Sequence, residues 1–309
     1  MEEARVLPAA RVLPAAHVIP AAHGKLGAHT SCTSDIPLNE LIDTCICSGW
    51  SCCQVFLGSP KNCDTRRQLT DSELVCSDGF TVYSHFPYTM NLVKRRTRKS
   101  LSGLQYELDC MEALNGYVVI HPNSPAIQGG PTNKQGMQGK RTIEYIAQYT
   151  KAIDTLVNNI KLLRNQHRLL LEPPAGEGQK IGWSYDQLTY MCQRLDAENL
   201  PVGFCIDTCH SFAAGLSRFR SAKSTRIFIH NLDAVGVLSR LRVIHLNDSK
   251  TPHLSMKDSH DLLGQGYIWS NAKEGLIELV TYCLGNGIDI ICETGGQHDV
   301  DIVLECLHL

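Results

Sequence analysis

Acidic and imidazole side chains stand at the ends of several apolar runs in this sequence. The run VGFCID (202–207) ends at Asp207, and His210 follows three positions later. Such side chains can bind a divalent cation or exchange protons with a substrate, but an aspartate here can also simply cap a helix. The choice between these functions depends on whether other runs end in the same way.

Eight short apolar runs have the length and composition of buried strands. They are KLGAH (25–29), CCQVFL (52–57), FTVYSH (80–85), GYVVIH (116–121), RLLLE (168–172), VGFCID (202–207), RVIHL (242–246) and DIICE (289–293). Amphipathic stretches with helical spacing separate them, for example 38–49 and 143–165. This alternation predicts an α/β fold, a parallel (β/α)8 TIM barrel built from eight strand–helix units. An open, doubly wound sheet is the alternative, but no GxGxxG follows the first run.

The carboxyl ends of barrel strands meet at one mouth, where active sites lie. Seven of the eight runs end in a side chain that can bind a metal: His29, His85, His121, Glu172, Asp207, His245 and Glu293. Asp258 and His260 follow the seventh run in MKDSHDLLGQG. So many carboxylates and imidazoles in one mouth would remain unpaired unless metal ions neutralised them. A set without cysteine predicts zinc or manganese in an open, catalytic geometry.

Composition narrows the class of protein. The chain has 309 residues, of which 43% are hydrophobic and 19% charged, as in soluble globular proteins. The formal net charge of −2 excludes a protein that is positively charged over its whole surface. Any affinity for nucleic acid must therefore come from a local cluster of basic residues. No apolar run is long enough to cross a membrane. Fourteen cysteines, many inside apolar runs, together with the lack of a secretory signal predict a reduced intracellular protein.

Two further segments differ in composition from their surroundings. Residues 1–24 contain RVLPAA twice and HVIPAA once, and a proline every six residues fits neither a helix nor a paired strand. We therefore expect a mobile, low-complexity extension before a catalytic domain at 25–309; a targeting role and an inert tail both stay open. The segment KRRTRK (94–99) carries five positive charges, which favours phosphate contacts over a solvated helix start.

Longer motifs make the chain after residue 25 resemble one family. They are HFPYTMNL, VIHPNS, LLLEPPAGEG, CIDTCHSFAAG, HLNDSK and DSHDLLGQG. The chain resembles the endonuclease IV family (AP endonuclease family 2), zinc-dependent abasic-site endonucleases of base excision repair with a xylose-isomerase-like barrel. The resemblance implies three Zn²⁺ per chain, with Mn²⁺ as a substitute. The implied ligands are His85, His121 and bridging Glu172 for the first ion, Glu172, Asp207, His245 and Glu293 for the second, and His210, Asp258 and His260 for the third.

The resemblance also implies an activity. Metal-activated water would hydrolyse the phosphodiester 5′ of an abasic site in double-stranded DNA, leaving a 3′-hydroxyl and a 5′-deoxyribose phosphate. Cleaning of 3′ ends would accompany it. Glu172 and Glu293 would be the catalytic carboxylates. We expect the protein to be a monomer and to be intracellular. The sequence does not distinguish among the cytoplasm, the nucleus and a viral particle.

The implied DNA contacts depart from the family pattern in places. They comprise Lys61, Tyr88, Lys94, Arg95, Arg96 and Arg98. Lys61 stands where the family has an arginine, and it keeps the charge without the planar guanidinium. Thr89 replaces a larger apolar residue beside Tyr88, and Ser259 replaces an arginine between two implied ligands.

Two other functions fit parts of the sequence. A sugar isomerase or epimerase shares the barrel but uses one or two metal ions, so the number of bound ions discriminates it. An inactive DNA-binding module would require a lost ligand, and every implied ligand is present.

Overall fold

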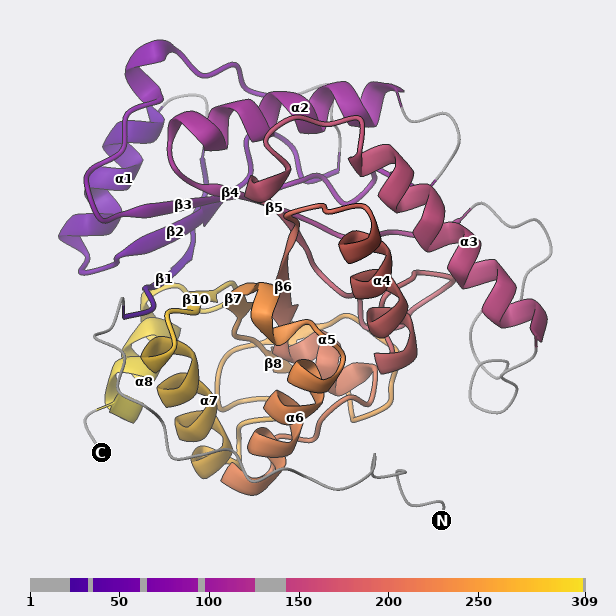
Figure 1. Ribbon diagram of the computed structural model, residues 1–309. Helices are drawn as coiled ribbons and strands as arrows, with labels where there is room; N and C mark the ends of the chain where they lie inside the picture. Colours follow the sequence, from indigo (N-terminus) through magenta and orange to yellow (C-terminus); the bar gives the residue numbers. More distant parts are fainter. Residues whose placement is uncertain (1–22, 33–35, 62–65, 94–97, 126–142, 308–309) are drawn as a thin grey trace.

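Eight parallel strands close into a barrel at the centre of the molecule (Figure 1). The computed structural model describes residues 23–32, 36–61, 66–93, 98–125 and 143–307. Around the barrel the strands follow the order β1-β10-β7-β6-β5-β4-β3-β2. Their bounds are β1 Leu26–His29, β2 Cys52–Val55, β3 Thr81–His85, β4 Tyr117–Ile120, β5 Leu169–Leu171, β6 Gly203–Asp207, β7 Leu241–His245 and β10 Asp289–Cys292. All eight predicted strands are confirmed, each within two residues of its expected ends.

Helices surround the barrel on its outside (Figure 1). They are α1 Leu38–Cys47, α2 Arg98–Ala113, α3 Ile143–Ile160, α4 Tyr185–Ala197, α5 Thr208–Ala213, α6 Ala222–Ala234, α7 Lys273–Gly285 and α8 Gln297–Leu307. The expectation of a helix after every strand is wrong for β2. Between β2 and β3, the described residues contain a 3-10 turn at Asp71–Glu73 and no α-helix. Among all the helices described, none is long and apolar enough to span a membrane.

A small antiparallel hairpin stands outside the barrel. Its strands are β8 (Asp248–Ser249) and β9 (His260–Asp261), and Ser249 pairs with His260. Two-residue strands have no hydrophobic periodicity, so the sequence did not predict them. The hairpin turns the chain after β7 back toward the barrel mouth.

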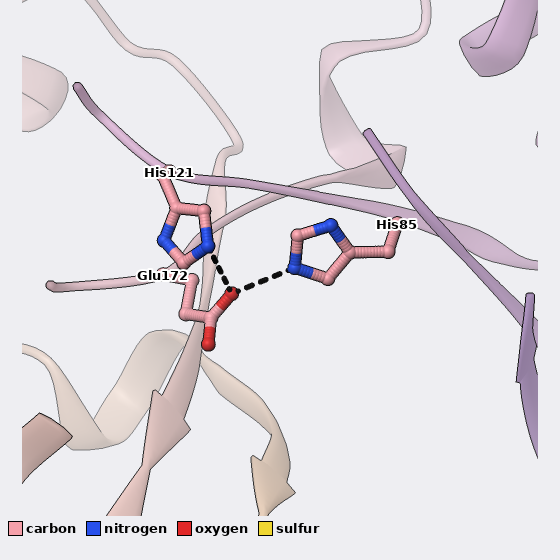
Figure 2. Close-up of side chains that lie close together, drawn as sticks. All are labelled: His85, His121 and Glu172. Carbon is pink, nitrogen blue, oxygen red and sulfur yellow. Dashed lines mark hydrogen bonds and ion pairs between the residues drawn. The ribbon is translucent and has the colours of Figure 1, made fainter. Parts of the chain in front are cut away.

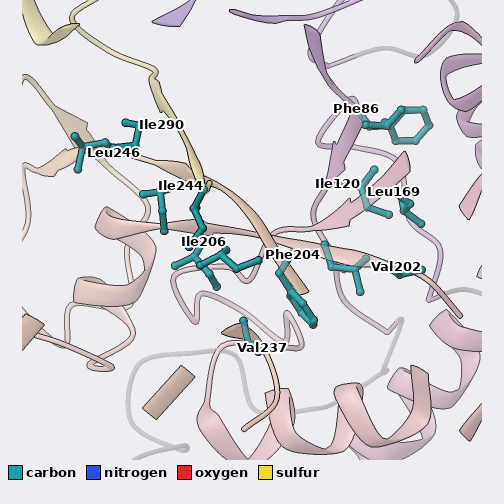
Figure 3. Packing of buried hydrophobic residues seen from close by; sticks show 14 of the residues in the cluster. Phe86, Ile120, Leu169, Val202, Phe204, Ile206, Val237, Ile244, Leu246 and Ile290 are labelled. Atoms are coloured by element: carbon teal, nitrogen blue, oxygen red, sulfur yellow. The ribbon is translucent and has the colours of Figure 1, made fainter. Parts of the chain in front are cut away.

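Apolar side chains fill two separate regions. The larger lies between the strands and the surrounding helices; Figure 3 shows part of it, including Phe204 on β6 and Ile244 on β7. The smaller fills the barrel interior and consists of Cys52, Tyr83, Val119, Leu170, Cys205, Val243 and Ile291. Side chains alternate across each strand, so neighbours in sequence enter different regions: Val119 points into the barrel, and Ile120 toward the helices.

The same alternation determines which residues line the mouth. Two positions beyond each interior residue, the next side chain points inward again, one level closer to the carboxyl ends of the strands. These residues are Gln54, His85, His121, Glu172, Asp207, His245 and Glu293. The polar layer of the barrel therefore follows directly from its apolar layer.

The predicted boundary between an N-terminal extension (1–24) and a catalytic domain (25–309) lies near the first residue that the structure describes, residue 23. Residues 1–22 of the expected extension lie outside the described residues, whereas the barrel begins with β1 at Leu26.

Candidate metal centre at the barrel mouth

Three polar side chains from neighbouring strands form the first group at the mouth. Figure 2 shows His85 from the end of β3 and His121 after β4, both directed at the carboxylate of Glu172 after β5. His85 Nε2 lies 3.0 Å and His121 Nε2 lies 3.5 Å from Glu172 Oε2. Glu172 is only 1% exposed, so its charge needs partners within the protein. One imidazole atom from each histidine and one carboxylate oxygen all lie within 4.8 Å of one another, as ligands of one ion would.

A second group shares Glu172 with the first. Its other members are Asp207, His245 and Glu293, from the ends of β6, β7 and β10. His245 Nδ1 lies 3.0 Å from Glu172 Oε1 and 3.3 Å from Glu293 Oε1. The two oxygens of Glu172 therefore point to different groups, Oε2 to the first and Oε1 to the second.

The third group lies beside the second and closer to solvent. It contains His210 from α5, Asp258 from the loop after β8, and His260 from β9. Asp258 Oδ2 is 3.2 Å from His210 Nε2, and its Oδ1 is 3.1 Å from His260 Nε2. His260 is brought there by the pairing of β9 with β8. The side chain of Asp258 is 38% exposed, so this group can meet a substrate from outside.

Carbonyl oxygens determine which ring nitrogen two of the histidines, His85 and His210, present to the groups. His85 Nδ1 lies 3.0 Å from the backbone oxygen of Phe86, and His210 Nδ1 lies 3.1 Å from that of Pro173. A carbonyl oxygen only accepts hydrogen bonds, so the nitrogen facing it carries the hydrogen. The other nitrogen, Nε2 in both rings, faces the carboxylates and is the atom that would bind a cation. Metal-binding histidines are usually oriented in this way.

The donor set fits divalent cations. Within the groups that the described residues form, three buried ring nitrogens make no hydrogen bond of acceptable geometry: His121 Nδ1, and His210 Nε2 and His260 Nε2, which lie close to Asp258 without being aligned with it. Buried polar atoms of this kind are costly unless something binds them. Oxygen and imidazole donors in groups of three or four suit zinc or manganese.

Electrostatics hold three of these residues, Glu172, Glu293 and His121, in the protonation states that bind cations. Burial opposes ionisation of Glu172, but the attraction of His121 and His245 outweighs it and holds the pKa of Glu172 well below the ordinary value. Burial also opposes ionisation of Glu293, yet His245 and His260 lower its pKa to about 2. Burial lowers the pKa of His121 to about 4, against the attraction of Glu172. Ionised carboxylates and a neutral imidazole are the forms that ligate metals.

For the histidines of the other groups the balance is reversed. Burial lowers the pKa of His210, His245 and His260, but nearby negative charge outweighs burial and raises the pKa of each. A cation must therefore displace a proton from each of these histidines.

Sequence reasoning missed two amides among these groups. Gln54 from β2 and Asn247, two residues after β7, are both fully buried and both contact Glu293. Neither type binds metals as readily as histidine or carboxylate, so neither stands out in the sequence. The spacing could have revealed Gln54, because it stands two positions after the interior residue Cys52 on β2.

Two other residues lie near the groups without joining the predicted set. His29 at the end of β1 lies 3.4 Å from Gln54 and belongs to none of the candidate metal groups among the described residues. The thiol of Cys205 lies within 4.8 Å of the ligand atoms of Glu172 and His245. Burial raises its pKa to about 12, which keeps it protonated and favours packing over ligation.

The predicted DNA contacts are only partly within the described residues. Tyr88 is 47% exposed, and its ring packs edge-on against His85 and lies 5.9 Å from the ring of His121. Lys61 is exposed and its backbone oxygen accepts a hydrogen bond from Thr89, so the two loops are joined beside the mouth. Arg98 is exposed at the first turn of α2. The remaining predicted contacts, Lys94, Arg95 and Arg96, fall outside the described residues.

Comparison with known proteins shows that the chain is similar to a family of TIM barrels and to proteins named endonuclease 4. A family model described as xylose isomerase-like TIM barrel matches residues 49–307. A protein of Halothermothrix orenii named "Probable endonuclease 4" is 29% identical over 294 residues, covering 90% of this chain and 98% of the relative. One of the same name from Akkermansia muciniphila is 30% identical over 227 residues, covering 72% and 74%. The crystal structure of endonuclease IV from Thermus thermophilus shares the fold, with a TM-score of 0.70 at 23% identity over 92% of this chain and 97% of that one.

Proposed function

The chain belongs to the endonuclease IV family of xylose-isomerase-like TIM barrels, and from this premise we propose that it is an abasic-site endonuclease of DNA base excision repair. The observation that carries the proposal is the sharing of Glu172 between two metal-capable groups, with a third group beside them. Adjacent cation sites suit phosphodiester hydrolysis, in which charge develops on both the attacking and the leaving oxygen. A relative named endonuclease 4 that aligns over 90% of this chain supports a nuclease over a sugar isomerase.

The proposed cofactors are three Zn²⁺ ions, with Mn²⁺ able to replace them. His85, His121 and Glu172 would hold the first ion, and Glu172, Asp207, His245 and Glu293 the second. His210, Asp258 and His260 would hold the third. When bound, such ions polarise the phosphate and lower the pKa of water to near neutrality.

The protein's own residues arrange this chemistry. Glu172 holds two groups together through its two oxygens, and its burial keeps water away from them. Glu293 sits at the edge of the second group with 15% of its side chain exposed, where a scissile phosphate can approach. We propose these two as the catalytic carboxylates. The products would be a 3′-hydroxyl and a 5′-deoxyribose phosphate, and blocked 3′ ends would be cleaned by the same groups.

The proposed substrate is double-stranded DNA that contains an abasic site. Tyr88 projects from the mouth beside the first group and would enter the gap left by the missing base. Lys61 and Arg98 would contact phosphates, together with Lys94, Arg95 and Arg96. We propose that residues 25–309 form the catalytic domain, that it acts as a monomer, and that it works where DNA is repaired inside the cell.

The test is incision of a duplex carrying one tetrahydrofuran abasic analogue. We expect cleavage on the 5′ side of the analogue, its loss with EDTA, and its return when Zn²⁺ is added back. Elemental analysis of the purified protein should give about three zinc ions per chain, whereas a sugar isomerase would use one or two. A metal-loaded protein that binds this duplex without cutting it would contradict the proposal and support the inactive DNA-binding module.

A further inference from the structure

Two buried amide side chains connect the residues of the second group. Gln54 contacts His245 and Glu293, and Asn247 contacts Asp207 and Glu293. The two amides thus link every member of this group except Glu172, which the first group shares. Both amides are 0% exposed.

The orientation of Gln54 follows from its partners. Its Nε2 lies 2.7 Å from Glu293 Oε1, and an ionised carboxylate can only accept, so this end of the amide is the NH₂ group. Its Oε1 lies 2.7 Å from His245 Nε2, which must therefore carry the hydrogen. Nδ1 of His245 is then the atom that would bind a cation, and it lies 3.0 Å from Glu172 and 3.3 Å from Glu293.

Gln54 does for His245 what the backbone does for His85 and His210. The ring nitrogens of His85 and His210 face the backbone oxygens of Phe86 and Pro173, which no substitution can remove. For His245 the accepting oxygen belongs to a side chain, and it comes from β2, the strand whose final residues supply no predicted ligand. The orientation of this one histidine can therefore be tested by mutation.

Asn247 completes the arrangement from the opposite side. Its Nδ2 donates to Asp207 Oδ2 at 2.6 Å and to Glu293 Oε2 at 2.8 Å. The backbone of Asn247 is held in turn, because its N–H donates to the Thr208 hydroxyl and its carbonyl accepts from the Trp269 indole N–H. Each carboxylate oxygen has a second lone pair, so these hydrogen bonds leave room for a cation.

We propose that Gln54 and Asn247 are positioning residues that set the affinity of the second cation site. The inference rests on the proposed function, since it assumes that Asp207, His245 and Glu293 bind a metal ion. Both amides would act through the ligands they contact, and not as ligands themselves. Each fixes the direction of two ligands, and the loss of such an outer hydrogen bond typically weakens metal binding 10- to 100-fold.

The test compares two buried glutamines. Gln54→Met keeps the approximate shape and removes both hydrogen bonds. Gln187→Met is the matched control, because Gln187 is also buried and hydrogen-bonded at both ends of its amide, to Gly182 and Tyr145, away from the metal groups. Zn²⁺ affinity is measured by competition with a chelating dye, and zinc content by elemental analysis. We expect one class of site to weaken about 10- to 100-fold in Gln54→Met alone.

Incision kinetics supply a second readout. In Gln54→Met, excess Zn²⁺ should restore much of kcat with little change in KM for DNA, as expected for a residue that acts through the metal site. Gln54→Glu keeps the acceptor for His245 but places a negative charge against Glu293, so its metal affinity should also fall. It replaces the methionine variant if that one fails to fold. Asn247→Leu should weaken the same class of site.

The outcomes separate this inference from the proposed function. Wild-type protein that binds no zinc or does not incise abasic DNA would contradict the proposed function itself. If the wild type binds zinc and incises, but the folded Gln54 variants bind zinc within about twofold of it, the positioning role is wrong. Equal weakening in Gln187→Met would show a general effect of destabilisation and would also overturn the inference.

Discussion

Asp207 caps the helix that carries His210. Asp207 Oδ1 accepts a hydrogen bond at 2.7 Å from the backbone N–H of His210, in the first turn of α5. Its other oxygen, Oδ2, accepts from Asn247 and lies 3.5 Å from His260 Nε2. Helix capping and metal binding are alternative interpretations of this pair in the sequence. In the structure the carboxylate has one oxygen available for each.

Asp207→Asn separates the two roles. Both Asp207→Asn and Asp207→Ala remove the acceptor of the Asn247 amide, so each should lower the unfolding free energy by about 1–3 kcal/mol. Asparagine is as good an N-cap as aspartate, so Asp207→Ala should cost about 1 kcal/mol more than Asp207→Asn. The charge facing the second group is lost in both variants, so incision should fall at least about 100-fold. Asp289→Asn is the control, since Asp289 is a buried strand aspartate at the opposite end of the barrel. Normal incision by folded Asp207→Asn would show that Asp207 is only a cap.

Glu172→Gln should abolish most activity without unfolding the protein. Glutamine keeps the shape but removes the negative charge that lies between two groups of imidazoles. We expect incision to fall by orders of magnitude in single-turnover assays, with the far-UV circular dichroism of the wild type. A loss of less than about tenfold, equivalent to about 1.4 kcal/mol in the barrier, would contradict the bridging role.

Removing His210 should empty the third group alone. His210, Asp258 and His260 are its only members in the described part of the chain, so His210→Ala should lower the zinc content by about one ion per chain. Asp258→Ala should do the same. His167→Ala serves as the control, because His167 is exposed just before β5, at the other end of the barrel. Unchanged zinc content in His210→Ala would refute the assignment.

The sequence predicted those parts of the site that depend on periodicity. Alternation within each strand determines which side chain points inward, so the polar residues that end the apolar runs are predicted together with the barrel. Glu172 and His245 are examples, each two positions beyond an interior residue, Leu170 and Val243. Their roles as metal ligands came from the family resemblance and remain predictions.

Other parts of the site have no periodic signal. Gln54 is of a residue type rarely considered as part of a metal site, and it lies within an apolar run instead of at its end. The position of His260 depends on the hairpin of β8 and β9, whose two-residue strands are too short to detect. The basic segment around Arg95 carries charge but no pattern of burial, so its contact with DNA remains a prediction.

Tyr88 and Arg98 should affect DNA binding in different ways. Tyr88→Ala removes a half-exposed ring beside His85 and should weaken binding and incision of abasic duplex far more than binding of intact duplex, since unstacking costs a few kcal/mol. Tyr88→Phe keeps the ring and should behave like the wild type. Equal losses of binding to abasic and intact duplex in Tyr88→Ala, measured by filter binding, would contradict the entry of Tyr88 at the lesion.

Arg98→Ala should weaken binding of both duplexes about equally and flatten the log–log salt dependence of binding by roughly 0.9. Filter binding over a salt series measures this effect.

Asp248 should determine the stability of the loop after the hairpin. Its fully buried carboxylate accepts hydrogen bonds from the backbone N–H groups of Ser249, Gly264, Gly266, Ile268 and Trp269, at 2.8–3.2 Å. In Asp248→Asn an NH₂ group replaces one accepting oxygen, so at least two of these donors lose their partner. A buried unsatisfied donor costs about 1–3 kcal/mol.

We therefore expect Asp248→Asn to lower the unfolding free energy in urea by at least about 2 kcal/mol. Zinc should be lost first from the third group, because β8 carries Asp248 and pairs with the strand of His260. Gly266→Ala tests the same contact from the other side, since a Cβ there would lie 2.5 Å from Asp248 Oδ1. Asp301→Asn, at an exposed aspartate on α8, should change stability by less than about 0.5 kcal/mol. If Asp248→Asn is equally mild, the five hydrogen bonds do not hold the loop, and the hairpin alone positions His260.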